Sequence, residues 1–106
     1  LLVHPLPGEG MSAVTVEFFT HPICTGCWDV SRMLERLSAE LPGAMELRQW
    51  SLADKAGRAR AEGLGVMEVP TVVIAGGERI VGVPEDAGRL RDRILAAAAR
   101  LAKETR

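Results

Sequence analysis

The chain has 106 residues, with 13 Lys and Arg against 14 Asp and Glu, a formal net charge of −1, and 47% hydrophobic residues. This length suits one globular domain, which removes about two thirds of its surface from water on folding. Because the charges of both signs are interspersed and no apolar run approaches the ~20 residues of a membrane helix, we expect neither nucleic acid nor a membrane as partner.

The first ten residues, LLVHPLPGEG, lack a starting Met, a basic region and a long apolar core, so they do not resemble a secretory signal. We interpret residues 1–10 as an N-terminal extension or a remnant of expression, with Met11 as the natural start and 11–106 as the domain. The chain holds only two cysteines, so its stability requires no disulfide framework. We therefore expect a cytoplasmic protein in a reducing compartment, and a monomer.

The first predicted strand covers residues 12–19, SAVTVEFF, because apolar Val14, Val16 and Phe18 alternate with the residues between them. From Thr25 the apolar period changes to three and four residues, which predicts a helix that ends at Pro42-Gly43. The apolar stripe of this helix consists of Cys27, Val30, Met33, Leu34, Leu37 and Leu41.

The rest of the chain is expected to form a strand over 44–50, a helix over 53–63, a strand over 71–75, a two-residue turn at Gly76-Gly77, a strand over 79–83 and a last helix after Pro84. The element order is then βαβαββα, an α/β domain with a four-stranded mixed sheet and three helices. A right-handed crossover pairs the first two strands in parallel, and the hairpin adds a strand that runs against the first one.

Cys24 and Cys27 stand where the first predicted strand gives way to the first helix. Cys27 continues the buried stripe, whereas Cys24 lies one turn earlier, at the helix start. Helix N-termini carry unpaired N–H groups and about half a positive charge, which stabilise a thiolate and lower the pKa of a thiol. The spacing therefore predicts Cys24 as a nucleophile and Cys27 as the thiol that resolves its adduct.

Two other interpretations of these cysteines stay open. In HPICTGC, His21, Cys24 and Cys27 have the chemistry of zinc or copper ligands, and a tetrahedral site would need His4 as a fourth donor. Alternatively, the domain binds a partner without turnover, as a redox-inert interaction module. The dithiol interpretation requires neither a bound metal nor an organic cofactor.

The element order, the Cys-x-x-Cys between the first strand and first helix, and EVPT before the third strand resemble the thioredoxin/glutaredoxin superfamily. The resemblance covers about residues 12–103. VTVEFFTHPICTGC is similar to the glutaredoxin-type stretch, and VPTVVIAGGERIVGVP is similar to the small single-domain members found in prokaryotes. The resemblance implies the thioredoxin fold and a thiol-disulfide oxidoreductase that acts on protein disulfides.

The same resemblance implies how a substrate is held. Pro70 would follow a cis peptide bond and face the cysteine pair, and the backbone of Val69 would pair with an extended substrate. The residues implied to contact the substrate are Ile23, Thr25, Gly26, Val69, Pro70 and Thr71. The implied partners are protein disulfides and a reductant, which is either a thioredoxin reductase or glutathione.

The chain also departs from the superfamily pattern. Thioredoxins keep a buried acid on the first strand, six residues before the first cysteine, where this chain has Phe18. Glu17 is one position off and should point to the other face of the sheet. Glutaredoxins usually hold the carboxylates of glutathione with basic side chains, but residues 11–31 contain no Lys or Arg. Glutathione binding would then require folding to bring in Arg48, Arg58 or Arg60.

Overall fold

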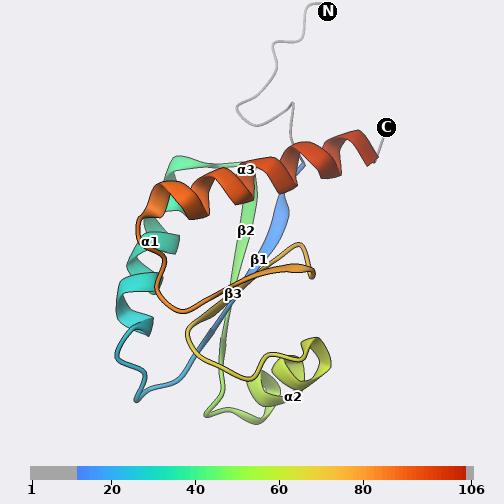
Figure 1. Ribbon diagram of the computed structural model, residues 1–106. Helices are drawn as coiled ribbons and strands as arrows, with labels where there is room; N and C mark the ends of the chain where they lie inside the picture. The colour runs from blue at the N-terminus through green and yellow to red at the C-terminus, as the bar shows by residue number, and fades with distance from the viewer. Residues whose placement is uncertain (1–11, 105–106) are drawn as a thin grey trace, which may run out of the picture.

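The computed structural model describes residues 12–104. The expected extension over residues 1–10, including His4, lies outside the described residues. The elements follow the predicted order (Figure 1): β1 (Val14–Thr20), α1 (Cys27–Glu40), β2 (Met45–Ser51), α2 (Lys55–Leu64), β3 (Thr71–Ile74), β4 (Glu78–Val81) and α3 (Ala87–Glu104).

The strands form one mixed sheet in the order β2-β1-β3-β4. β1 runs parallel to β2 and antiparallel to β3, with Phe18 opposite Val72, and β3 pairs antiparallel with β4. The predicted topology is therefore confirmed. β1 lies inside the sheet, so its carboxyl end delivers the chain to the segment that holds the cysteines.

The two faces of the sheet are covered by different helices. α1 and α3 pack on one face, where the core includes Phe18, Leu34 and Ile94. α2 packs on the other face, where Ala61 joins a smaller cluster with Phe19 and Val73. Figure 1 shows α2 set apart from α1 and α3. Within residues 12–104, no helix combines the length and apolar character needed to cross a bilayer.

The turn between β3 and β4 differs from the predicted Gly76-Gly77 turn. The residues with positive φ are Ala75 at 55° and Gly76 at 72°, and the Gly77 N–H donates to the Ile74 carbonyl over 3.1 Å. Two successive residues with positive φ match the right-handed twist of the flanking strands. Because Ile74 pairs with Glu78, the loop consists of residues 75–77, so it begins one position earlier than predicted and is one residue longer.

Candidate active site

The α1 helix begins at Cys27 rather than at Thr25 as predicted. Its first hydrogen bond runs from the Val30 N–H to the carbonyl of the N-cap residue, Gly26, over 3.3 Å. Ahead of it the chain makes a turn, in which the Cys24 N–H donates to the His21 carbonyl over 2.9 Å. Cys24 therefore lies in this turn, just before the helix rather than in its first turn.

The two cysteines are joined in a disulfide, with Cα atoms 5.5 Å apart. Cys27 is only 5% exposed and belongs to the core beside Phe18 and Val30, whereas Cys24 is half-buried. The predicted difference in exposure is confirmed. No side chain caps the N-terminus of α1, so the first N–H groups of the helix remain available to stabilise a thiolate at Cys24.

Cys24 opens onto a groove of about 660 Å³. We call this site the Cys24 groove, and it is lined by His21, Ile23, Cys24, Thr25, Gly26, Val69, Pro70, Gly82 and Val83. The peptide bond between Val69 and Pro70 is cis, as expected. The fold thus brings the loop before α1, the loop before β3 and the segment after β4 to one site.

Five of the six residues implied to contact a substrate lie in the Cys24 groove, and Thr71 is the exception. Thr71 is 1% exposed, and its hydroxyl donates to the Glu68 carbonyl over 2.7 Å. Its position as the first residue of β3 turns the side chain inward. Thr71 therefore holds the segment before Pro70 in place and does not line the groove.

Gly82 and Val83 also line the groove, although they were not among the residues implied to contact a substrate. The Gly82 N–H donates to the Pro70 carbonyl over 2.8 Å, which ties the end of β4 to the cis-proline segment. The sequence did hold a clue to their position: both residues lie near the end of VPTVVIAGGERIVGVP, and the beginning and end of this stretch meet at the groove.

The Cys24 groove is lined by apolar and neutral side chains, apart from His21. The Nδ1 atom of His21 accepts a hydrogen bond from the Ile23 N–H over 3.2 Å, and Ile23 itself is 84% exposed. The groove therefore offers apolar surface but no Lys, Arg, Asp or Glu side chain.

The three arginines considered for glutathione binding lie elsewhere. Arg48 pairs with Glu46 over 3.1 Å. Arg58 donates to the carbonyls of Leu52 and Ala53. Arg60 pairs with Glu17. None of these arginines lines the groove, so none of them is placed to bind the carboxylates of glutathione there.

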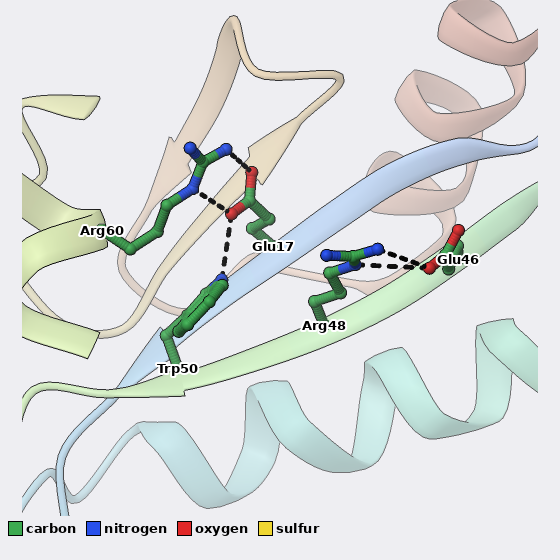
Figure 2. A network of polar contacts seen from close by, with 5 residues as sticks. All are labelled: Glu17, Glu46, Arg48, Trp50 and Arg60. Atoms are coloured by element: carbon green, nitrogen blue, oxygen red, sulfur yellow. Dashed lines mark hydrogen bonds and ion pairs between the residues drawn. The ribbon is translucent and has the colours of Figure 1, made fainter. Parts of the chain in front are cut away.

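Glu17 is buried on the face of the sheet that α2 covers (Figure 2). Its carboxylate accepts hydrogen bonds from Arg60 over 2.7 and 2.8 Å and from the Trp50 indole N–H over 2.9 Å. The hydrogen bond from Arg60 lowers the pKa of Glu17, burial acts in the opposite direction, and the Trp50 N–H supports the charged form. The sequence analysis placed Glu17 on this face but did not identify its partners.

The metal interpretation gains no support within residues 12–104. This part of the chain holds no cluster of three or more His, Cys, Asp or Glu side chains that could bind a metal ion. Cys24 and Cys27 are bonded to each other, and the Nδ1 atom of His21 is directed to the backbone.

Known proteins resemble the chain in both sequence and structure, although no protein-family model matches it. A thioredoxin from Methanocaldococcus jannaschii is 35% identical over 74 residues, which cover 70% of this chain and 85% of that protein. A mutant thioredoxin from Halobacterium salinarum superposes with a TM-score of 0.69 at 26% identity, covering 82% of this chain and 76% of the other. The thioredoxin of Fasciola hepatica has the same fold, with a TM-score of 0.68 at 22% identity over 84% of this chain and 85% of its own. The sequence similarity covers most of the Methanocaldococcus jannaschii thioredoxin, and the Cys24–Cys27 disulfide lies at the start of α1. The chain therefore belongs to the thioredoxin family and is a thiol-disulfide oxidoreductase.

Proposed function

We propose that the chain reduces or exchanges disulfides of other proteins, with Cys24 as the attacking residue. The Cys24 thiolate attacks one sulfur of a substrate disulfide, a mixed disulfide forms, and the other substrate sulfur leaves as a thiolate. The Cys27 thiolate then attacks the Cys24 sulfur, which closes the Cys24–Cys27 disulfide and releases the second substrate sulfur. Two electrons pass from the dithiol to the substrate.

The observation that carries this proposal is the unequal exposure of the two bonded cysteines. A substrate disulfide can reach only a sulfur that faces the groove, and Cys24 lines the groove while Cys27 is 5% exposed. Cys27 is nevertheless close enough to Cys24 to bond with it. This arrangement supports an order in which Cys24 reacts first and Cys27 second.

The backbone of Val69 supports an extended protein segment as the substrate. Val69 precedes β3 and lines the Cys24 groove. Among residues 12–104, its amide and carbonyl have no backbone partner. An extended peptide can pair with such a segment by strand addition, with its side chains directed toward the apolar walls.

The groove also favours protein disulfides over glutathione disulfide. Glutathione carries carboxylates, which bind most strongly to Arg or Lys. The Cys24 groove contains neither, and its most exposed large apolar side chain is that of Ile23. We therefore expect a thioredoxin reductase, rather than glutathione, to recycle the oxidised protein.

Two cysteine variants test the proposal, with a model protein disulfide as substrate. Trapping uses the pre-reduced variants without dithiothreitol, because dithiothreitol would cleave a mixed disulfide, and the rate of reduction is measured with dithiothreitol as reductant. Cys27→Ser should accumulate a mixed disulfide at Cys24, because the second attack is lost. Cys24→Ser should abolish reduction without trapping a substrate. Mass spectrometry of the trapped species and the rate of substrate reduction provide the two readouts.

The proposal fails if the wild-type protein does not exceed the rate with dithiothreitol alone. The assignment of roles fails if Cys24→Ser traps the substrate and Cys27→Ser does not. Comparing the recycling rates with glutathione and with a thioredoxin reductase plus its nicotinamide reductant tests the choice of electron donor.

A further inference from the structure

The side chain of Val83 occupies the space beside Gly26 at one wall of the Cys24 groove. A Cβ atom built on Gly26 would lie 2.7 Å from Cγ2 of Val83, closer than real side chains pack. The same Cβ would meet the Pro70 ring at 3.6 Å, which is an ordinary contact. Val83 is therefore the side chain that fills this part of the groove.

The backbone fixes Val83 in that position. The preceding residue, Gly82, has a φ of 87°, which turns the chain at the end of β4. Its N–H donates to the Pro70 carbonyl over 2.8 Å, so this turn is anchored to the cis-proline segment. Val83 is still 46% exposed and lines the Cys24 groove, so groups that enter the groove can contact its side chain.

We infer that Val83 is a specificity-determining residue that limits the size of the substrate residue next to the reactive cysteine. This inference rests on the proposed function. A substrate bonded to Cys24 must place the neighbours of its cysteine along the groove walls, and the wall beside Gly26 and Pro70 is filled by Val83. Substrate cysteines with small neighbours fit this wall, whereas large neighbours collide with it.

The test uses two symmetrical disulfides of end-capped tripeptides, Gly-Cys-Gly and Leu-Cys-Leu, reduced at the expense of dithiothreitol. We expect the wild-type protein to have the higher kcat/KM with the glycine peptide. Val83→Ala should raise the ratio of leucine to glycine kcat/KM by about tenfold, the lower end of what small changes in an apolar pocket produce.

Val81→Ala is the matched control. Val81 is also an exposed valine, at 52%, but it does not line the Cys24 groove. This variant should keep the wild-type ratio. An unchanged ratio in Val83→Ala, or a ratio that falls because Val83 attracts large apolar neighbours, overturns the inference. A wild-type protein that reduces neither peptide and no protein disulfide refutes the proposed function instead.

A double variant tests whether Val83 and Gly26 share this space. Gly26→Ala alone should slow reduction of the glycine peptide, because the new methyl group displaces Val83 into the groove. Adding Val83→Ala removes the colliding Cγ2 atom and should recover most of the lost rate. Equal losses from Gly26→Ala in both backgrounds would show that the two positions are independent and would overturn the inference.

Discussion

Replacing Gly57 with alanine is expected to destabilise the protein, although alanine is the better helix former. Gly57 lies in α2, and a Cβ atom there would be 1.8 Å from the Ser51 carbonyl oxygen and 2.6 Å from its carbon. These are backbone atoms at the end of β2, so they cannot rotate away as a side chain would. α2 would have to move off the sheet, and with it Arg60 and Ala61.

The magnitude follows from two opposing effects. Overpacking costs up to about 3 kcal/mol, and we use this upper value because the colliding atoms belong to the backbone. Alanine returns about 1 kcal/mol through its helix propensity. We therefore expect Gly57→Ala to lower the free energy of unfolding by about 2 kcal/mol, measured by urea denaturation.

Gly63 in the same helix provides the control. A Cβ atom on Gly63 would have no neighbour within 4 Å, so Gly63→Ala should raise the free energy of unfolding by up to about 1 kcal/mol. The two identical substitutions should thus act in opposite directions. If both variants are more stable than the wild-type protein, the close contact between α2 and Ser51 does not exist and the reasoning is refuted.

Two further predictions concern charge and the hairpin loop. Glu17→Gln should cost about 1.5–3 kcal/mol at pH 7, the range for hydrogen bonds to charged groups. Because folding lowers the pKa of Glu17, this stabilisation is present above the unfolded pKa of about 4.3 and is lost as the pH falls through the lower folded value. The loss should therefore shrink in urea titrations at pH 3, and an equal loss at both pH values would contradict the charge argument. Glu46→Gln, which breaks an exposed pair with Arg48, should change the stability little. Ala75→Gly should raise the melting temperature, since the φ of 55° strains a residue with a side chain, and a fall would contradict this reading of the loop.

The sequence pattern was sufficient for the features that depend on local periodicity. The apolar stripe from Cys27 to Leu37 predicts that Cys27 lies on the buried face of α1, and the structure confirms it. The alternation in β1 separates Phe18 from Glu17 onto opposite faces of the sheet. The start of α1 was predicted less accurately, because the turn in which the Cys24 N–H is bound produces no periodic pattern of apolar residues in the sequence.

The contacts between distant segments could not be predicted in the same way. Glu17 meets Trp50 and Arg60, which lie 33 and 43 positions away in the chain. A charged residue beside two phenylalanines does signal a buried charge that needs a partner. However, which cation supplies it depends on where α2 packs. Val83 was missed for the same reason, since only the fold brings it to Gly26.

The placement of Glu17 also affects how the second thiol loses its proton. Glu17 is the only charged residue that is buried in the described part of the chain, and its carboxylate faces α2 and holds Arg60. Cys27 lies across the sheet from it, in a core cluster of apolar residues that includes Phe18. No buried carboxylate is therefore positioned to accept the Cys27 proton from inside. In the proposed order of attack, the Cys27 proton therefore passes to solvent or to a reacting sulfur rather than to a buried carboxylate.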